Sequence, residues 1–385
     1  MAAVLTHNLN DLKKITFFVD ECQRQHIPVL GPDVNESFHN FMVNNKGEIR
    51  FGLAAIKNVG GAAAENIISE RKENGPFSSI FDFAKRVNLK SVNKRSIEAL
   101  AMAGAFDGFE NTHRAQYFYR ENTEDTIFLE KVVKFANDYQ VQKNSAQASL
   151  FGETSDVEIK DPELPECAPW TKIEQLKNEK EITGFYMSGH PLEDFKLEID
   201  NFCNVTITDL KNNKEKYKNK NVTFAGILTS VNHRTSKSGN PFANFTLEDF
   251  TDFDSYILFS EDYLKMKHFL LEGSSLLIKA SIVERKFKNG QLDIRINSIM
   301  LLSEALERNT SKIQLSVSLS ALTDDLINSI EGLVKKSKGN CKLNFTINDL
   351  EDKTNISLLG TNNLVEPSGF MKGIQEFEEV RFVLK

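Results

Sequence analysis

Three aspartates offer the most direct chemistry in the sequence: Asp249, Asp252 and Asp254. Carboxylates two positions apart, such as Asp252 and Asp254, can hold the divalent cations that assist phosphoryl transfer. All three fall, however, in a short connection between two expected strands, where turns favour aspartate. We interpret them as turn residues and predict neither a catalytic residue nor a metal site in this chain. A metal-dependent hydrolase or nucleotidyltransferase would require turnover that is lost in alanine variants of both Asp252 and Asp254.

No other reactive side chain has the neighbours that catalysis would need. His190 is followed by Pro191 and has no serine or cysteine nucleophile pattern nearby, so we interpret it as a structural corner. Four cysteines lie far apart without a Cys-x-x-Cys pair: Cys22, Cys167, Cys203 and Cys341. They predict neither a zinc site nor a disulfide framework, and we expect reduced, mostly buried thiols.

The composition indicates a multidomain globular protein. The 385 residues, of which 40% are hydrophobic, suffice for roughly two to four domains with a core each. With 54 acidic and 47 basic residues the net charge is −7, so any nucleic-acid site must be local. No apolar run could span a bilayer, and residues 1–7 do not resemble a signal peptide. We therefore expect a cytoplasmic protein with no membrane partner.

Residues 147–152 form a short apolar hook in a polar segment. Leu150 and Phe151 are adjacent, so neither the period of a helix nor that of a strand would bury both. A partner's pocket could bury them, with Gln147 as the polar anchor and Ser149 between. The pattern Gln-x-x-Leu-Phe resembles the peptide by which bacterial replication and repair proteins bind the sliding clamp. The alternative is an exposed loop whose apolar side chains pack on their own domain.

An alanine-rich stretch near residue 60 predicts a helix, a tight turn and a second helix. Asn58 and Gly60 tolerate a positive φ on either side of Val59, as a helix-hairpin-helix turn requires. The amides of Gly60 and Gly61 at the second helix's start, assisted by Lys57, could bind a DNA backbone phosphate independently of sequence. A purely structural αα-hairpin is the alternative.

A second hairpin is expected downstream, with one helix opening near residue 77 and another through residues 92–100, stopped by Gly104. Four side chains would give it a basic edge: Lys90, Lys94, Arg95 and Arg114. A helical run from about residue 112 to residue 142 would then lead to the hook. Of these residues, Lys94 and Arg95 are our candidates for duplex DNA contacts.

The segments before the first hairpin and after residues 147–152 predict structural elements without a chemical role. Upstream, we expect a helix from residue 12, a short buried strand within residues 26–35, and a hairpin over residues 38–51. Downstream of the hook, residues 162–169 are rich in proline and acidic residues, as a linker would be, and residues 170–182 predict a helix.

Five runs of alternating polarity predict an OB barrel: residues 222–231, 242–248, 255–259, 276–287 and 291–301. A helix over residues 262–271 would separate the third run from the fourth. In the second run, Phe245 and Leu247 would face the core and leave Phe242 and Asn244 outside, as base stacking requires. The other candidate contacts to single-stranded DNA come from two basic loops: Arg234, Lys237, Arg285, Lys286, Phe287 and Lys288. The alternative is an OB domain that serves only as a scaffold.

Residues 312–385 predict the order strand, helix, strand, strand, helix, strand, which fits a small split βαβ sandwich. No cluster of residues in this tail suggests chemistry. The basic run over residues 211–220 is interpreted as a solvated surface. Together the segments predict a multidomain α+β protein with a helical helix-hairpin-helix domain, an OB barrel and a small α/β sandwich at the C-terminus.

Five segments, taken in order, resemble the C-terminal half of the bacterial DNA polymerase III alpha subunit: residues 22–35, 53–71, 93–107, 147–152 and 184–192. The resemblance implies the end of the fingers (1–51), a tandem helix-hairpin-helix domain on duplex DNA (52–145), a clamp-binding peptide (146–153), a linker and helical connector (154–220), an OB domain at single-stranded template (221–303), and a domain contacting the clamp-loader tau subunit (310–385).

The same resemblance implies that the polymerase palm lies upstream and is absent from this chain. The metal-binding aspartates belong to the palm, so Mg²⁺ is expected only there, and this chain is expected to have no cofactor and no polymerase activity alone. The partners implied are primer-template DNA, the sliding clamp (beta subunit) and the tau subunit. A free-standing clamp-associated repair or recombination factor, built from the same modules, remains the alternative.

Overall fold

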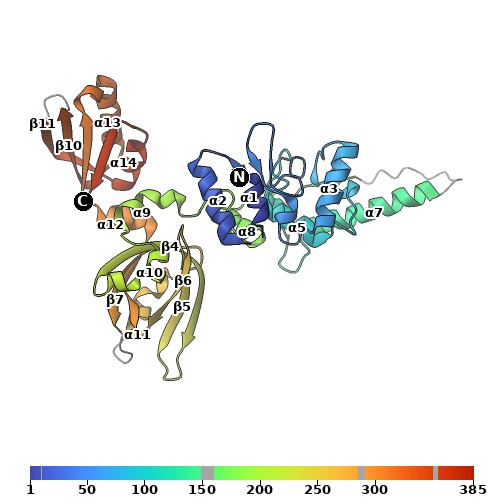
Figure 1. The fold of residues 1–385 in the computed structure, drawn as a ribbon, viewed down its shortest axis with the longest axis horizontal. Helices are drawn as coiled ribbons and strands as arrows, with labels where there is room; N and C mark the ends of the chain where they lie inside the picture. Colours follow the sequence, from blue (N-terminus) through green and yellow to red (C-terminus); the bar gives the residue numbers. More distant parts are fainter. Residues whose placement is uncertain (10, 149–159, 285–290, 350–353) are drawn as a thin grey trace. The chain divides into compact units, whose positions relative to one another are not determined.

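The computed structural model describes residues 1–9, 11–148, 160–284, 291–349 and 354–385. It divides into two compact units, Met1–His190 and Pro191–Lys385 (Figure 1). Both units combine helices with sheets, so the multidomain α+β class is confirmed. Among the described residues, no helix is both long and apolar enough to cross a membrane.

The first unit is mainly helical, with one small sheet of order β1-β3-β2. Its elements are α1 (Ala2–His7), α2 (Leu12–Arg24), β1 (Val29–Leu30), β2 (Met42–Val43), β3 (Ile49–Arg50), the 3₁₀ turn η1 (Leu53–Ala55), α3 (Gly61–Asn74), α4 (Ile80–Arg86), α5 (Lys94–Ala103), α6 (Arg114–Tyr117), α7 (Phe128–Ala148) and α8 (Lys172–Thr183).

The small sheet confirms the expected hairpin and shortens the expected strand. Gly47 has a φ of +81° in the turn between β2 and β3, a backbone conformation that favours glycine. The strand expected within residues 26–35 is only Val29–Leu30, and both residues are half-buried. Pro28 and Pro32 flank it, and proline cannot donate to a sheet, so the strand cannot extend.

Aromatic rings form the centre of the first unit's core. Phe83 on α4 packs edge-to-face against Phe77 and against Phe106, with 5.0 Å between ring centroids in each pair. Phe106 in turn lies 5.8 Å from Tyr117 on α6. Such edge-to-face pairs add to the stabilisation that burial gives. The rings therefore tie α4 and α6 to the segment that follows α5.

The helical run expected from residue 112 to residue 142 is wrong in its middle. Helix α6 ends at Tyr117 and α7 begins at Phe128. Between them Asp125 accepts hydrogen bonds from the backbone amide and the side chain of Asn122, at 3.0 and 2.9 Å. Asparagine and aspartate compete with helical hydrogen bonds in this way and favour turns. The helix stop at Gly104 is confirmed, with a left-handed φ of +83°.

The second unit holds two sheets. Its elements are η2 (Glu193–Phe195), α9 (Lys196–Phe202), α10 (Ile207–Asn212), η3 (Lys214–Tyr217), β4 (Asn221–Thr235), β5 (Pro241–Glu248), β6 (Phe253–Phe259), α11 (Ser260–Met266), η4 (Lys267–Phe269), β7 (Ser275–Glu284), β8 (Leu292–Leu301), η5 (Leu302–Glu304), α12 (Ala305–Asn309), β9 (Lys312–Ser318), η6 (Leu319–Ala321), α13 (Asp324–Lys336), β10 (Lys338–Asp349), β11 (Thr354–Val365), α14 (Pro367–Ile374) and β12 (Val380–Leu384).

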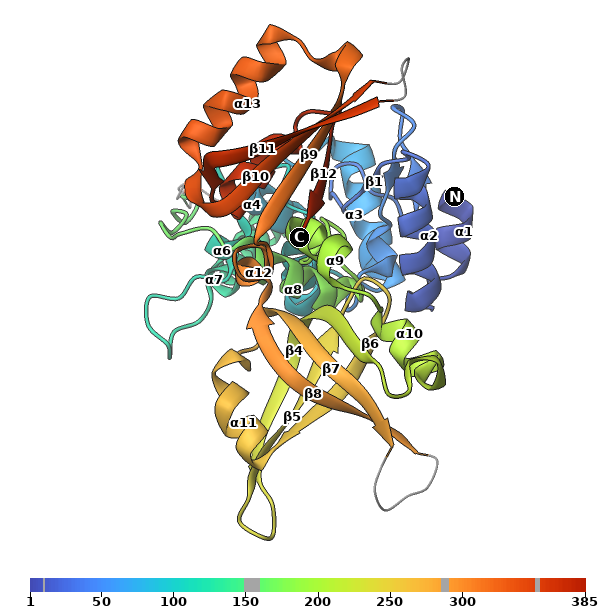
Figure 2. The same ribbon diagram turned by 90° about the vertical axis from the view of Figure 1, so that its left-hand side faces the viewer.

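The first of these sheets has the expected five strands, in the order β6-β5-β4-β7-β8, with every neighbouring pair antiparallel. Helix α11 follows the third strand, as predicted, and the strands curve around a common core (Figure 2). Phe224, Phe245 and Tyr256 meet inside it, where the Tyr256 ring lies 5.3 Å from Phe224 and 5.9 Å from Phe245. The strand order and the position of the helix are those of an OB barrel.

The second sheet has the order β11-β10-β9-β12. Strands β9 and β10 are adjacent and parallel with α13 between them in sequence, whereas β11 and β12, linked through α14, lie at opposite edges. The second βαβ unit is thus split by two strands, as the predicted topology required. Strand residues Ile313, Leu315 and Leu343 are fully buried in a core shared with α14.

Candidate nucleic-acid interface

The turn before α3 is built on residues spaced three apart. Leu53, Ile56 and Val59 are all buried, and between them only the three residues of η1 are helical. Our expectation of a full helix before this turn is therefore wrong. The 3₁₀ segment ends at Ala55 and Ile56 is extended, so Ile56 and Val59 are buried by the path of the turn and not by one face of a helix.

The backbone of the turn agrees in part with the predicted hairpin. Asn58 has a φ of +70°, and the Val59 side chain is buried as the apolar plug. Gly60, by contrast, has a φ of −71° and a ψ of 163°, so the second positive φ that we expected is absent. Gly60 caps α3 without a side-chain hydrogen bond, and Gly60 and Gly61 are both exposed. A helix start of this kind presents free amides to an anion.

The start of α5 lies beside this turn. Asn93 caps α5 by accepting a hydrogen bond from the Ser96 amide at 3.1 Å. The buried Ser96 hydroxyl donates to the carbonyl oxygen of Asn58 at 2.9 Å. Lys94 and Arg95, the first two residues of α5, are exposed. The structure therefore brings together two predicted groups that are far apart in sequence: Lys57, Asn58, Gly60 and Gly61 with Lys94 and Arg95.

One member of the expected basic edge is not available. Arg114 is buried, and its guanidinium lies 2.6 Å from a carboxylate oxygen of Asp107 and 2.6 Å from one of Glu179. Burial alone would lower the pKa of Arg114, but these two carboxylates together raise it above its ordinary value. Gly104 leaves the space for this guanidinium, since a Cβ there would collide with Nη2. Arg114 thus holds the unit together instead of facing DNA.

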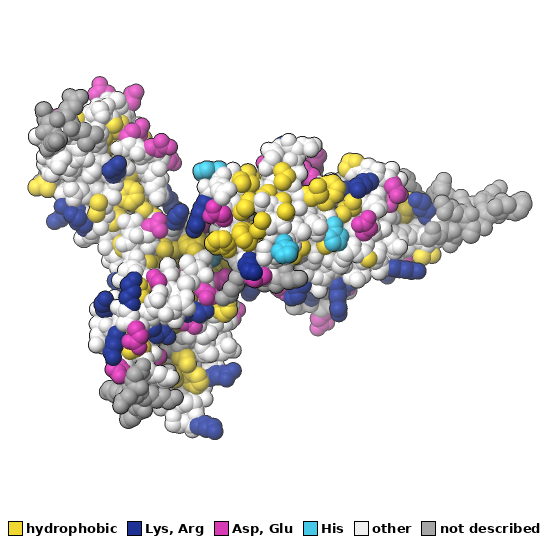
Figure 3. All heavy atoms as spheres, in the orientation of Figure 1, with side chains coloured by type: hydrophobic (Ala, Val, Ile, Leu, Met, Phe, Trp, Pro, Cys, Tyr) yellow, Lys and Arg dark blue, Asp and Glu magenta, His cyan; other side chains and the backbone are white. Residues whose placement is uncertain are grey.

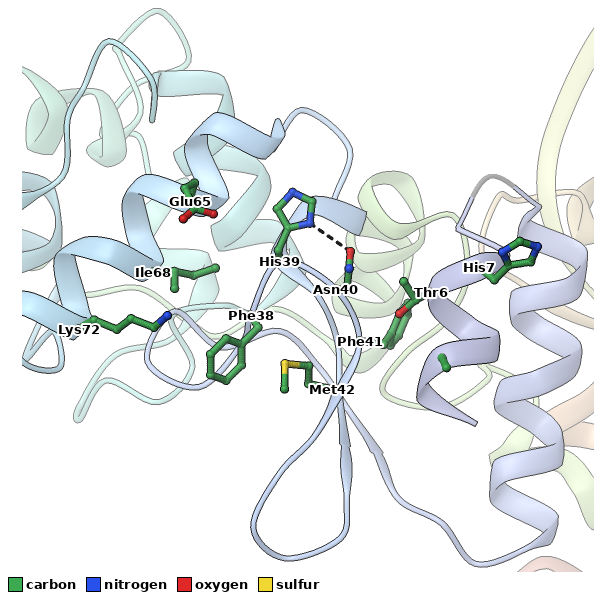
Figure 4. Close-up of a pocket in the computed structure, with 11 residues that line it drawn as sticks. Thr6, His7, Phe38, His39, Asn40, Phe41, Met42, Glu65, Ile68 and Lys72 are labelled. Atoms are coloured by element: carbon green, nitrogen blue, oxygen red, sulfur yellow. Dashed lines mark hydrogen bonds between the residues drawn. The ribbon is translucent and has the colours of Figure 1, made fainter.

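Elsewhere on the surface, basic and acidic side chains are interspersed. On the face drawn in Figure 3, Lys and Arg side chains are scattered among Asp and Glu side chains. A pocket of about 550 Å³ beside α3 is lined by residues that include Phe38, Met42, Glu65 and Lys72 (Figure 4). His39, which also lines it, forms a hydrogen bond with Asn40. Acidic, basic and apolar groups alternate there, so the pocket suggests no particular ligand.

The outer face of the OB barrel carries an aromatic platform. Phe245 and Leu247 are buried and Phe242 and Asn244 lie on the other face of β5, as predicted. Opposite Phe242 in the register is Phe259 of the edge strand β6, and the two rings stack with 5.9 Å between centroids. Arg234 on β4 is the other cross-strand neighbour of Phe242. A cation and two rings therefore lie side by side.

Strand β6 adds residues that our sequence reasoning missed. Phe253, Ile257 and Phe259 are exposed by 55%, 45% and 60%, on the same face as Phe242 and Asn244. The signal was present in the sequence, because Tyr256 and Leu258 alternate with them and are buried. Lys237 is exposed in the loop between β4 and β5. The remaining predicted contacts, Arg285, Lys286, Phe287 and Lys288, lie outside the described residues.

The aspartates between β5 and β6 have structural partners. Asp249 accepts a hydrogen bond from the Ile207 amide at 2.7 Å, and Asp252 pairs with Lys211 at 2.9 Å. Both lie in the connection that we predicted, whereas Asp254 already belongs to β6. Their contacts fasten α10 to the barrel. Among the described residues, no group of histidine, cysteine, aspartate or glutamate side chains is arranged to hold a metal ion.

The remaining candidates have structural settings or lie outside the described part of the chain. His190 packs against the Tyr186 ring at 4.9 Å. Burial raises the pKa of the Cys203 thiol to about 12, so this cysteine is not a reactive thiolate. Helix α7 includes Gln147, but Ser149, Leu150 and Phe151 of the predicted clamp peptide lie outside the described residues.

Three family models match the chain in succession. They are a helix-hairpin-helix motif over residues 26–117, an OB-fold nucleic acid binding domain over residues 222–302, and the C-terminal domain of the DNA polymerase III alpha subunit over residues 313–384. The DNA polymerase III subunit alpha of Borreliella burgdorferi is 32% identical over 348 residues, which are 88% of this chain. The chain belongs to the DNA polymerase III alpha subunit family.

Other members of the family match over similar lengths. The subunit alpha of Escherichia coli K12 is 32% identical over 86% of this chain, and that of Pseudomonas aeruginosa is 28% identical over 92%. The chain spans only 28–30% of the length of these three relatives. The second OB-fold domain of replication protein A from Methanococcus maripaludis, a solved structure, covers 25% of the chain at 15% identity and a TM-score of 0.18. Within the family, this chain corresponds to the C-terminal portion.

Proposed function

We propose that this chain is the part of a replicative DNA polymerase that holds DNA and partner proteins, while nucleotide transfer occurs elsewhere in a longer protein. The observation that carries the proposal is the hydrogen bond from Ser96 to Asn58, which places the starts of α3 and α5 side by side. The match of residues 313–384 to the C-terminal domain of the alpha subunit favours a polymerase over a repair factor. We expect no polymerase activity from this chain alone, because the resemblance implies that another part of the polymerase supplies the Mg²⁺-binding palm.

Duplex DNA would contact the two helix starts through its backbone. The exposed amides of Gly60 and Gly61 and the side chains of Lys57, Lys94 and Arg95 offer hydrogen bonds and charge to phosphate oxygens. None of these groups is placed to distinguish bases, so binding would be independent of sequence. A polymerase that travels along a template needs this kind of contact.

Replacing Lys57 and Arg95 together by alanine is expected to flatten the salt dependence of duplex binding. Each phosphate contact contributes about 0.9 to the slope of log K against log salt, so two lost contacts should reduce it by roughly 1.8. Fluorescence anisotropy with a labelled duplex at several NaCl concentrations measures this slope. The matched control is Lys14→Ala/Arg24→Ala on α2. An equal loss in the control would assign the effect to net charge and contradict the site.

Single-stranded template would lie on the platform of β5 and β6. Phe242 and Phe259 provide stacking surfaces, and Arg234 provides phosphate-pairing charge next to Phe242. A scaffold domain would gain nothing from aromatic side chains left exposed on one face. The supporting observation is thus that Phe253, Ile257 and Phe259 are all exposed on one face of β6.

The variant Phe242→Ala/Phe259→Ala is expected to bind single-stranded DNA at least about tenfold more weakly, because base stacking on a ring contributes about 1–3 kcal/mol. Titration of a labelled oligothymidylate, followed by anisotropy, measures the affinity. Phe17→Ala, which removes an exposed ring from α2, serves as the control. Unchanged binding by the double variant would leave the barrel as a scaffold.

The partner proteins complete the proposal. Residues 147–151 would bind the sliding clamp, and the four-stranded domain after Lys312 would contact the clamp-loader tau subunit. The clamp assignment comes from the resemblance alone, and the tau assignment comes from the resemblance together with the matched C-terminal domain. A replicative role implies a cytoplasmic location.

A further inference from the structure

Lys94 is already occupied by a carboxylate from another helix. Its Nζ lies 2.7 Å from Oε1 of Glu130 on α7, and 3.7 Å from Oε1 of Glu98 one turn along α5. Lys94 is the first residue of α5, so this ion pair stands at the helix start that adjoins the Asn58 turn. A carboxylate therefore takes one of the three N–H donors of Lys94 and balances the charge that the lysine would offer to a DNA phosphate.

The surroundings of Arg95, the cation next to Lys94, are different. Arg95 is exposed as well, and among the described residues no carboxylate lies within ion-pair distance of it. The two cations of the α5 start are thus unequal: Arg95 is open to a ligand, while Lys94 must first leave Glu130. All three side chains of the Lys94, Glu98 and Glu130 cluster remain partly accessible to solvent. Such exposed pairs contribute only about 0–1 kcal/mol, so a strong anion can displace Glu130.

We propose that Glu130 is a built-in competitor that DNA phosphate must displace from Lys94, so that α7 limits the affinity of the duplex site. The inference rests on the proposed function, because it concerns the same surface. Its ligand is the phosphodiester backbone of duplex DNA. Exchange of one carboxylate for one phosphate keeps Lys94 paired in both states and returns Glu130 to solvent. Affinity is therefore lower than the number of cations at this surface would give.

The experiment uses the full chain and a fluorescein-labelled duplex of mixed sequence, over a series of NaCl concentrations. Glu130→Gln is expected to bind about two- to fivefold more tightly at low salt, the gain that losing an exposed ion pair allows. Its slope of log K against log salt should be somewhat steeper, because rising salt screens the competing Lys94–Glu130 pair only in the wild-type chain and so offsets part of the affinity lost there. Glu110→Gln, which removes the same charge from an exposed position of the first unit, should bind like the wild type.

A second comparison, made in a chain that lacks Lys94, distinguishes displacement of Glu130 from a general effect of net charge on DNA binding. In a Lys94→Met chain, Glu130→Gln is expected to have no effect, since the competition no longer exists. An equal gain in that background, or no gain in the wild-type background, would overturn the proposal. If the wild-type chain failed to bind duplex at all, the proposed function would fall, and the competitor with it. Matching thermal unfolding of all variants shows that the differences arise at the surface.

Discussion

Replacing Leu150 and Phe151 together by alanine is expected to weaken binding to the cognate sliding clamp by about a hundredfold or more. Two adjacent large apolar side chains that fill a partner's pocket act as a hot spot, and removal of each costs about 2 kcal/mol. Each 1.4 kcal/mol corresponds to about a tenfold change in affinity. Isothermal titration calorimetry with the chain and the clamp from the same organism measures both affinities.

A control for this variant lies on α7 itself. Val141 is 64% exposed on α7, so Val141→Ala removes apolar surface a few residues before the predicted peptide in sequence and should leave clamp binding intact. Gln140 donates to the carbonyl oxygens of Lys85 and Val87, at 3.1 and 2.9 Å, and so holds α7 on α4. The double alanine variant should keep duplex binding. Equal clamp binding by variant and wild type would show that residues 147–151 are not the clamp-binding peptide. The proposed polymerase role would then rest on the DNA-binding modules alone.

The sequence predicted the two sheets of the second unit well, because their pattern is local. In β5 and β6 the buried residues alternate with exposed or half-buried ones, and a one-residue shift would turn the whole strand inside out. The tail was equally clear, since α13 covers the predicted helix and begins with the side-chain cap of Thr323. In such segments neighbouring residues alone decide the structure.

The error at Arg114 arose because distant residues decide its environment, whereas the errors in helix bounds have other causes. From the sequence, Arg114 was predicted to be a basic surface residue. In the structure it pairs with Glu179, which lies 65 positions away in the chain. The break after Tyr117 has a local origin, the turn that Asn122 and Asp125 form. The loss of an α-helix before Asn58 shows that a packed core accepts several local geometries for the same apolar spacing. Helical periodicity alone cannot distinguish them.

The duplex site combines both kinds of information. The turn at Asn58 could be recognised from its residue types, as could the cap at Asn93 before α5. The hydrogen bond from Ser96 that joins the Asn58 turn to α5 could not be predicted from the sequence, because it depends on how α5 packs. The same packing delivers Glu130 to Lys94, so α7 belongs to the electrostatics of the site although it carries none of its predicted contacts.

Removing the guanidinium of Arg114 is expected to cost the first unit about 3–5 kcal/mol of unfolding free energy. Glu179 is fully buried and accepts from Arg114 at 2.6 Å and from the Ser188 hydroxyl and amide at 2.7 and 3.1 Å. In Arg114→Met the carboxylate would keep the serine but lose its cation, and an uncompensated buried charge is strongly destabilising. Urea unfolding followed by circular dichroism measures the loss.

Two further variants decide whether the buried charge is the cause. Arg24→Met, which breaks an exposed pair with Glu21 on α2, should cost less than about 1 kcal/mol. Adding Glu179→Met to Arg114→Met should recover much of the loss, because removing both charges leaves neither unpaired. If the double variant were as unstable as the sum of the single ones, lost packing would be responsible. Recovery would show that the unpaired buried charge of Glu179 causes the loss in Arg114→Met.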